Sequence, residues 1–291
     1  MKVVILGHNG FIGHQITEYF NSQAPDIEII GLSRPEIDLC DRDSSRRIID
    51  YLSPDTTVIM LAAIKKQLGD NLEIYMQNMS MIENVCEMVQ QRPLRQFVYF
   101  SSAAVYGEDI HNMQITENTQ VNPRSFYGIA KFTSERLLST TFQSGSTSLA
   151  ILRPPLIYGN GDLSNGYGPS YFLDNIMNDK EIIIWGNGSE LREFLYIKDI
   201  ARIVYGVVQS KFNGVLNPVN GKSHSFQYVL DRLISLTGKT PTITYRERTK
   251  DKVDNRFSND LLRKTFPEFH FTELDEGLGE IVKKEQQKRG L

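Results

Sequence analysis

The chain of 291 residues has a formal net charge of −3, and 40% of its residues are hydrophobic. The length allows one large core or two moderate cores, and the absence of a basic excess excludes nucleic acid as an expected partner. Two cysteines, Cys40 and Cys86, form neither a metal-type nor a disulfide pattern, and no apolar run approaches the length of a membrane span. We therefore expect a cytoplasmic protein without a bound metal.

The first residues have the pattern of a dinucleotide-binding turn. Residues 3–6 form a short apolar run, which is typical of a strand buried in a parallel sheet. The run Gly7-His8-Asn9-Gly10-Phe11-Ile12-Gly13 follows, and residues 12–20 have helical periodicity. A strand, a glycine turn and a helix in this order direct backbone N–H groups at a pyrophosphate. The segment therefore predicts nucleotide binding.

A second strand is expected at residues 28–32, and its end distinguishes the two nicotinamide cofactors. An acidic side chain there binds the ribose hydroxyls of NAD, whereas an arginine accommodates the 2′-phosphate of NADP. Ser33 and Arg34 follow this strand, without a carboxylate at its tip. The sequence favours NADP(H) over NAD(H), with an Arg34 that points into solvent as the alternative. A further short strand is expected at residues 37–39, with Asp38 near the adenine.

Strands and helices continue to alternate through the first half of the chain. Apolar runs predict strands at residues 57–63, 97–100 and 149–152, and helical periodicity covers residues 71–91. A long surface loop is expected at residues 108–123. This alternation predicts a Rossmann-type doubly wound parallel sheet.

The candidate catalytic groups lie at the end of one strand and the start of one helix. In the segment Ser125-Phe126-Tyr127-Gly128-Ile129-Ala130-Lys131, the phenol and the ammonium are one helical turn apart. A lysine beside a tyrosine favours the phenolate, so we expect the pKa of Tyr127 to fall from about 10 towards neutral. Ser102 follows the strand at residues 97–100, at the sheet edge where parallel sheets bind ligands. The alternative is a surface helix without chemistry.

Three motifs together resemble one known family. They are Gly7-x-x-Gly10-x-x-Gly13, Ser102 four residues before Tyr106-Gly107, and Tyr127-x-x-x-Lys131. The chain resembles the extended short-chain dehydrogenase/reductases, and more narrowly the NAD-dependent epimerase/dehydratase family that acts on nucleotide sugars. The likeness continues through residues 153–159 and 185–199. It implies an NAD(P)-binding Rossmann domain at residues 1–156, to which the chain returns around residues 186–210, and a smaller α/β part at residues 157–291 that binds the substrate.

The resemblance also assigns roles to single residues. It implies that Tyr127 is the acid/base, that Lys131 lowers its pKa and holds the nicotinamide ribose, and that Ser102 bonds to the substrate oxygen. Arg192 would bind the substrate phosphates, with an ion pair to Glu190 or Glu193 as the alternative. The residues expected to bind the cofactor are Gly7, Asn9, Gly10, Phe11, Ile12, Gly13, Ser33, Arg34, Asp38, Leu39, Leu61, Ala62, Ala63, Asn78, Tyr127, Lys131 and Pro154. Those expected to bind the substrate are Ser102, Ala103, Tyr127 and Arg192.

Departures from the family pattern narrow the expected reaction. Sugar dehydratases of the family have an Asp-Glu pair where this chain has Ala103 and Ala104, and methyl groups transfer no protons. Some stretches resemble fucose synthases, but Ala104 takes the place of their cysteine, and Gly166 or Tyr167 takes that of their histidine. The reaction that the resemblance still implies is hydride transfer at a single sugar carbon, C4.

Three functions are therefore considered for the chain. The first is an NADPH-dependent reductase of 4-keto nucleotide sugars, which Arg34 favours. The alternative is an NAD-dependent C4 epimerase of nucleotide sugars, which uses the same three catalytic residues. The third is a nucleotide-binding scaffold without catalysis. A homodimer that pairs the helices at residues 72–91 and 126–141 is expected from the resemblance.

Overall fold

The computed structural model describes residues 1–162, 167–249 and 251–290. The chain divides into two compact units. The first unit comprises residues 1–108, 119–154 and 200–218, and the second comprises residues 109–118, 155–199 and 219–291. The break after residue 154 is close to the predicted boundary after residue 156. The segment that returns to the first unit is 200–218, whereas the sequence placed it around residues 186–210.

The first unit is built on a six-stranded parallel sheet with the strand order β10-β6-β4-β3-β1-β2. This order confirms the predicted doubly wound parallel sheet. Its strands are β1 (Lys2–Leu6), β2 (Glu28–Leu32), β3 (Thr56–Met60), β4 (Gln96–Phe100), β6 (Ser148–Leu152) and β10 (Gly214–Leu216).

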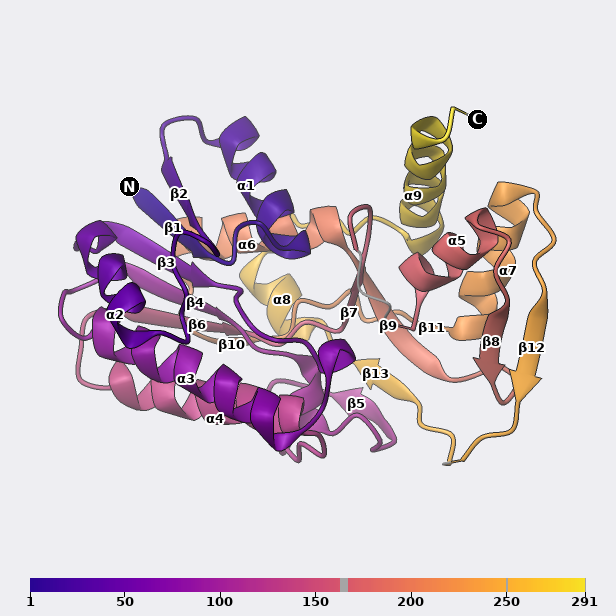
Figure 1. The fold of residues 1–291 in the computed structure, drawn as a ribbon, viewed down its shortest axis with the longest axis horizontal. Coiled ribbons are helices and arrows are strands. Elements are labelled where there is room, and N and C mark those ends of the chain that lie inside the picture. The colour runs from indigo at the N-terminus through magenta and orange to yellow at the C-terminus, as the bar shows by residue number, and fades with distance from the viewer. Residues whose placement is uncertain (163–166, 250, 291) are drawn as a thin grey trace. The chain divides into compact units, whose positions relative to one another are not determined.

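Helices cover both faces of this sheet. The helices α3 and α4 lie on one face, and α1 and α6 lie on the other (Figure 1). Because both faces are covered, the apolar side chains of residues 3–6 are fully buried, which explains why the run does not alternate. The helices are α1 (Phe11–Gln23), α2 (Arg42–Ser45), α3 (Leu72–Val89), α4 (Phe126–Thr141) and α6 (Ile197–Ser210), with short 3₁₀ helices at Arg46–Tyr51, Lys66–Leu68 and Ala103–Tyr106.

Capping residues fix where α3 and α4 begin. The Asn71 side chain accepts a hydrogen bond of 3.0 Å from the backbone N–H of Ile74. The Ser125 hydroxyl accepts one of 3.0 Å from the N–H of Gly128. Each cap satisfies a backbone donor that the first turn of a helix leaves without a partner. The cap at Ser125 therefore places Tyr127 in the first turn of α4.

The second unit consists of three small sheets and several helices. One sheet has the order β11-β9-β7, and the pairs β12-β8 and β13-β5 are each parallel. The helix α7 packs against both α5 and α9. The strands are β5 (Asn112–Ile115), β7 (Leu156–Tyr158), β8 (Ile182–Trp185), β9 (Leu191–Tyr196), β11 (Ser223–Ser225), β12 (Ile243–Arg246) and β13 (Asn255–Phe257), and the helices are α5 (Pro169–Met177), α7 (Phe226–Thr237), α8 (Asp260–Thr265) and α9 (Leu274–Lys288).

Two of the predicted elements are wrong. Residues 37–39 form no strand, because the carboxylate of Asp38 accepts a 2.9 Å hydrogen bond from the N–H of Cys40 and closes a turn. The predicted loop at residues 108–123 contains β5, which pairs with the distant β13. Within the described ranges, no helix combines the length and the apolar character needed to cross a membrane.

Candidate active site

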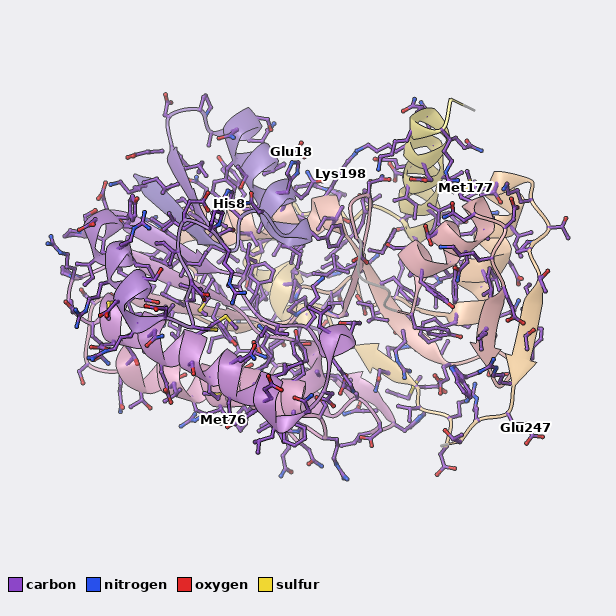
Figure 2. The ribbon with its side chains drawn as sticks, viewed as in Figure 1. His8, Glu18, Met76, Met177, Lys198 and Glu247 are labelled. Atoms are coloured by element: carbon purple, nitrogen blue, oxygen red, sulfur yellow. The ribbon has the colours of Figure 1, made fainter. Side chains whose placement is uncertain are left out.

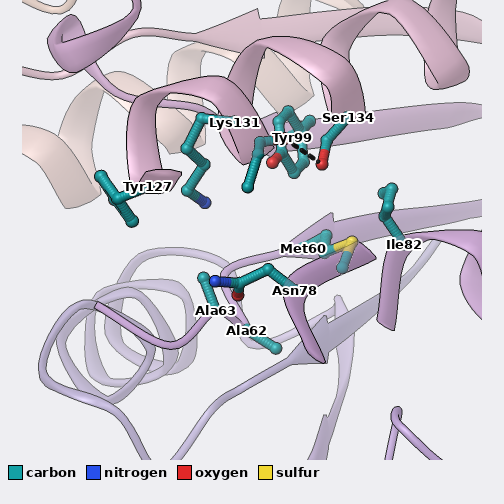
Figure 3. A pocket seen from close by; sticks show the side chains of 10 residues that line it. Met60, Ala62, Ala63, Asn78, Ile82, Tyr99, Tyr127, Lys131 and Ser134 are labelled. Atoms are coloured by element: carbon teal, nitrogen blue, oxygen red, sulfur yellow. Dashed lines mark hydrogen bonds between the residues drawn. The ribbon is translucent and has the colours of Figure 1, made fainter. Parts of the chain in front are cut away.

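The end of β4 and the start of α4 bring the three predicted catalytic residues together. Ser102 follows β4, and its hydroxyl accepts a 3.2 Å hydrogen bond from the N–H of Ala104. A hydrogen bond joins the hydroxyls of Ser102 and Tyr127. Figure 3 shows Tyr127 and Lys131 projecting from α4 towards Ala63 and Asn78 on the opposite wall of a small pocket. The phenol of Tyr127 therefore lies at the edge of the sheet, where the spacing predicts it.

Lys131 is held away from the phenol. It is only 5% exposed, and its ammonium Nζ donates a 2.6 Å hydrogen bond to the carbonyl oxygen of Phe100. The same nitrogen lies 5.8 Å from the ring centroid of Tyr127 and 5.0 Å from that of Tyr99. Burial lowers the pKa of Lys131 to about 7, and the negative charge of Glu135 opposes this shift.

The structure corrects the expected pKa of Tyr127. Desolvation raises it to about 12, although the hydrogen bond from Ser102 favours the phenolate. Lys131 does not lower this pKa as predicted, because its ammonium donates a hydrogen bond to the carbonyl of Phe100 instead. Burial therefore favours the neutral phenol of Tyr127.

The glycine turn forms a cradle for a dinucleotide. Gly7 has φ = +94°, and a Cβ on it would lie 2.9 Å from the backbone nitrogen of Ala62. A Cβ on Gly13 would lie 2.4 Å from the carbonyl oxygen of Gly7. Only glycine fits at these positions. The cavity over the turn measures ≈ 320 Å³, and it is lined by Gly7, Gly10, Phe11, Ile12, Gly13, Arg34, Leu61, Ala62, Ala63, Ile64, Lys65 and Met81.

The other predicted cofactor residues lie around this cavity or support it. Leu39 and Ser33 line an adjoining cavity of ≈ 100 Å³, together with Arg34. The Asn78 side chain accepts a hydrogen bond from the N–H of Ile64 at 2.8 Å and donates one to its carbonyl at 3.1 Å, so it fixes the loop after β3. The carbonyl of Pro154 accepts a 2.9 Å hydrogen bond from the N–H of Ala103. Pro154 thus supports the strand end that carries Ser102.

The tip of β2 contains both an arginine and a carboxylate. The Arg34 guanidinium lies 3.3 Å from a carboxylate oxygen of Asp38, and its side chain is 65% exposed. The Ser33 hydroxyl accepts a 3.2 Å hydrogen bond from the N–H of Asn9 and lies 3.0 Å from Nδ1 of His8. Figure 2 shows His8 in the turn between β1 and α1. Asp38 thus partly neutralises the charge on which the expectation of NADP(H) depended.

Some lining residues had no sequence signal. Lys65 lines the cavity over the glycine turn, and its ammonium lies 5.9 Å from the ring centroid of Phe11. Tyr99 and Ser134 line the pocket of Tyr127, and a hydrogen bond joins their hydroxyls (Figure 3). These residues belong to no recognisable motif, because each lies in an ordinary strand, helix or loop.

In the second unit, Arg192 lies in a cavity of its own. The cavity measures ≈ 410 Å³ and is lined by Tyr167, Trp185, Gly188, Glu190, Arg192, Phe226, Arg248, Thr249 and Asp251. Glu190 connects two guanidiniums, with Oε1 3.3 Å from NH1 of Arg248 and Oε2 3.7 Å from NH2 of Arg192. Arg192 also donates hydrogen bonds to the carbonyls of Leu191 and Val253. The cavity therefore contains two guanidiniums with the carboxylate of Glu190 between them, and Asp251 adds a second carboxylate to its lining.

The remaining sequence candidates of this unit lie elsewhere or outside the described residues. Glu193 does not pair with Arg192, because its carboxylate accepts hydrogen bonds from the N–H groups of Asn220 and Gly221. Burial raises the pKa of Glu193 to about 8. Tyr167 packs its ring 4.5 Å from that of Phe226, centroid to centroid, and Gly166 lies outside the described residues.

The fold and the site define a class of protein. A parallel Rossmann sheet, a glycine cradle and a Ser-Tyr-Lys set at the sheet edge are the parts of an enzyme that uses a nicotinamide dinucleotide for hydride transfer. Residues 3–219 match the model of the NAD dependent epimerase/dehydratase family. The chain belongs to this family and is an NAD(P)-dependent enzyme, which confirms the expectation from the motifs.

Individual relatives are distant in sequence. The chain is 26% identical to the N-acetyl-alpha-D-glucosaminyl-diphospho-ditrans,octacis-undecaprenol 4-epimerase of Escherichia coli over 213 residues, which are 70% of this chain and 62% of that protein. It is 23% identical to the GDP-L-fucose synthase of Escherichia coli over 218 residues, 69% of this chain and 67% of that protein. The crystal structure of the UDP-glucose 4-epimerase of Thermus thermophilus in complex with NAD has a TM-score of 0.82, with 22% identity and coverage of 97% of this chain and 98% of that chain. The likeness to this crystal structure shows that the two chains share a fold.

Proposed function

We propose that this protein is a nucleotide-sugar C4 epimerase that uses NAD. The observation that carries the proposal is the composition of the catalytic edge. One phenol, Tyr127, is bonded to Ser102 beside the dinucleotide cavity, and alanines occupy positions 103 and 104. Such a site can transfer a proton to or from one sugar oxygen. The methyl groups at positions 103 and 104 cannot transfer the further protons that the removal of water requires. Two of the similar proteins named above are 4-epimerases, which agrees with this proposal.

The chain's own residues support a reversible oxidation at C4. Bound NAD would supply a hydride acceptor and return the hydride to the opposite face of the ketone. Tyr127 removes the hydroxyl proton of C4 and later returns it. Ser102 holds the same oxygen, and the buried Lys131, whose ammonium lies 5.8 Å from the ring centroid of Tyr127, supplies a positive charge that favours the phenolate.

The choice of NAD is favoured by the charge balance at the tip of β2. Arg34 is exposed and shares its charge with Asp38, so its attraction for a 2′-phosphate is reduced. The fit of a dinucleotide to the glycine turn is independent of this choice, since that cradle contacts the pyrophosphate.

Reduction of a 4-keto nucleotide sugar with NADPH is the second candidate. Arg34 lines both cavities beside the glycine turn, and the relative named GDP-L-fucose synthase favours this reaction. A fluorescence titration of the nucleotide-free protein with NADH and NADPH separates the two. We expect NADH to bind at least as tightly as NADPH; NADPH affinity about tenfold higher, a difference of about 1.4 kcal/mol, would transfer support to the reductase.

The direct test uses UDP-glucose as the probe. The NAD-loaded protein is expected to form UDP-galactose without net production of NADH, measured by anion-exchange chromatography and absorbance at 340 nm. UDP-N-acetylglucosamine is assayed in parallel, because the sugar is not fixed by the site. No C4 epimer from any nucleotide sugar of a UDP, GDP or dTDP panel would contradict the proposal.

We place the diphosphate of the substrate in the cavity of Arg192. Guanidiniums bind phosphate through paired N–H donors, and Arg192 and Arg248 both line this cavity. Trp185 and Tyr167 add aromatic surface on which a base can stack.

We also propose a homodimer that pairs α3 and α4 with the same helices of a second copy. These helices pack against each other in the first unit and carry exposed apolar side chains, with Leu72 60% and Met76 55% exposed. Met76 lies on the outer side of α3 (Figure 2), and Phe126 and Ile129 of α4 are also exposed. Sedimentation of wild type and Met76→Glu tests this: a dimer that the variant dissociates is expected, and a monomeric wild type would contradict it.

A further inference from the structure

A buried chain of hydrogen bonds lies directly behind the catalytic edge. Arg153, which follows β6, donates to Glu135 of α4 through two parallel bonds, Nε to Oε1 at 2.9 Å and NH2 to Oε2 at 2.6 Å. Oε1 of Glu135 also accepts a hydrogen bond from the hydroxyl of Ser101. All three side chains are buried, and Glu135 is only 3% exposed. The first unit thus contains a fixed ion pair with a hydroxyl attached to it.

The far side of the ion pair is anchored as well. NH1 of Arg153 donates a 3.0 Å hydrogen bond to the hydroxyl of Tyr106, and that hydroxyl donates one of 2.8 Å to Asn217. The guanidinium therefore has a fixed orientation, which it passes to Glu135 through the two parallel bonds.

At its other end, the hydrogen-bond network reaches Ser101, whose two neighbours in the sequence both contact proposed catalytic residues. The carbonyl of Phe100, just before Ser101, accepts a hydrogen bond from the ammonium of Lys131. The hydroxyl of Ser102, just after it, is hydrogen-bonded to Tyr127. Glu135 lies one helical turn after Lys131 on α4. A single carboxylate thus fixes the strand end to the helix at the place where both carry catalytic residues.

Stability alone is a weak reason for such an arrangement. Desolvating two charges costs several kcal/mol per ion, and buried ion pairs are often replaced by apolar residues without loss of stability. We propose that Ser101, Glu135 and Arg153 are positioning residues: they hold residues 100–102 against α4, so that the carbonyl of Phe100 receives Lys131 while Ser102 meets Tyr127. This proposal rests on the proposed function, because it assigns these residues to the same catalytic site.

The ion pair also affects the charge of Lys131. The titratable groups that face its ammonium are Tyr99 of β4 and Tyr127 and Glu135 of α4. Among these, Glu135 raises the pKa of Lys131 and so opposes the effect of burial. The two bonds from Arg153 hold this carboxylate in place.

Ser101→Ala is the variant that separates positioning from folding. It removes one hydroxyl, while both bonds between Arg153 and Glu135 remain. Ser45→Ala is the matched control, since Ser45 is also fully buried in the first unit but donates its hydroxyl to the carbonyl of Asp41 in the turn before α2. Glu135→Gln is the stronger variant; it leaves the charge of Arg153 uncompensated, and far-UV circular dichroism checks that it folds.

Two readouts are measured on these variants. The first is the epimerisation of UDP-glucose, or of the panel member that wild type converts, as kcat and KM. The second is the pKa of Lys131, from the NMR titration of ¹³Cε in lysine-labelled protein without substrate, with Lys131→Arg used for assignment. The second readout needs no turnover, so an inactive wild type contradicts the proposed function while the titration still tests positioning.

For Ser101→Ala we expect kcat to fall about 10–100-fold with KM nearly unchanged. Lys131 should titrate about one pH unit lower than in wild type, because the carbonyl of Phe100 that accepts the hydrogen bond from its ammonium is no longer held in place. Ser45→Ala should match wild type in both. Glu135→Gln, if folded, should lower the titration of Lys131 further. Wild-type titration of Lys131 in Ser101→Ala would overturn the proposal, and so would a loss of thermal stability without any change in titration.

Discussion

Tyr127 is the residue on which the proposed chemistry depends most. Its hydroxyl is bonded to Ser102, and burial raises its pKa to about 12. Tyr127→Phe removes the proton carrier but leaves the ring in the pocket, so we expect kcat to fall at least ~100-fold with NADH affinity unchanged by fluorescence. Tyr228→Phe, which removes a hydroxyl bonded to Asp275 in the second unit, is the control. Full turnover in Tyr127→Phe would remove this residue from the mechanism.

Glu190 is one of two acidic residues that line the cavity around Arg192. Its carboxylate lies between Arg192 and Arg248 and partly neutralises both. Glu190→Gln keeps an oxygen that can accept the bonds from Arg248 and the N–H of Val253, but it adds one net positive charge. We expect UDP to bind about tenfold more tightly to the variant in isothermal titration calorimetry at low salt. Glu273→Gln, at an exposed ion pair with Lys222, is the control. Weaker UDP binding in Glu190→Gln would contradict this expectation and would show that the carboxylate is needed to hold the two arginines in place.

For single residues, the sequence predicts which side chains lie close together, but it does not predict their pKa values. Ser102, Tyr127 and Lys131 come together because strand end and helix spacing are local properties. The pKa of Tyr127 depends instead on burial and on the partner that Lys131 finds, the carbonyl of Phe100. Neither is visible in the linear sequence. Arg192 pairs with Glu190, one of the two partners that the sequence left open, whereas the pairing of Arg34 with Asp38 was not predicted.

At the scale of elements, the glycine turn between β1 and α1 allows a matched comparison. A Cβ at Gly13 would clash with backbone atoms of Gly7 and His8, which cannot move without opening the turn. Gly13→Ala should therefore weaken NADH binding at least about tenfold. Gly279, inside α9, has open space around it, so Gly279→Ala should raise the free energy of unfolding by about 0.5–1 kcal/mol. Binding by fluorescence and stability by urea unfolding test both variants, and wild-type NADH affinity in Gly13→Ala would contradict the cradle.

The strand β9 contributes a pH-dependent term to stability through Glu193. Burial raises the pKa of Glu193 from 4.5 to about 8 in the folded state, so between these two pH values the folded protein binds a proton that the unfolded chain does not. The free energy of unfolding should therefore fall as the pH rises through this window.

Glu193→Gln removes this term and keeps an acceptor for the N–H groups of Asn220 and Gly221. We expect the variant to match wild type near pH 5 and to exceed its stability by roughly 3 kcal/mol near pH 8. Urea unfolding at the two pH values measures this. An equal difference at both values would show that Glu193 does not titrate between them.

Elements with a buried apolar run or helical periodicity were predictable from the sequence, and β5 was not. The strands β1, β2 and β4 and the helix α3 follow from apolar runs and helical periodicity. The strand β5 has four residues, and its partner β13 lies more than a hundred residues later, with an irregular register. Such a pairing depends on tertiary contacts, so the segment looked like a loop.

At the scale of the whole molecule, the fold and the family were predictable, but the path of the chain was only partly so. The motifs and the alternation of strands and helices predict the Rossmann sheet, which the strand order confirms. The chain returns to the first unit with residues 200–218, and residues 109–118 belong to the second unit. Periodicity identifies a helix or a strand, but it does not show against which unit that element packs.

Isotope transfer at C4 tests the central claim most directly. UDP-glucose labelled with deuterium at C4 is incubated with the NAD-loaded protein, and the products are followed by NMR and mass spectrometry. An epimerase that holds its cofactor returns the same hydride, so we expect UDP-galactose, or the C4 epimer of the accepted panel sugar labelled in the same way, with deuterium retained at C4 and no accumulated NADH. Retention of the starting configuration, together with NADPH-dependent reduction of a 4-keto sugar, would contradict the account and identify a reductase.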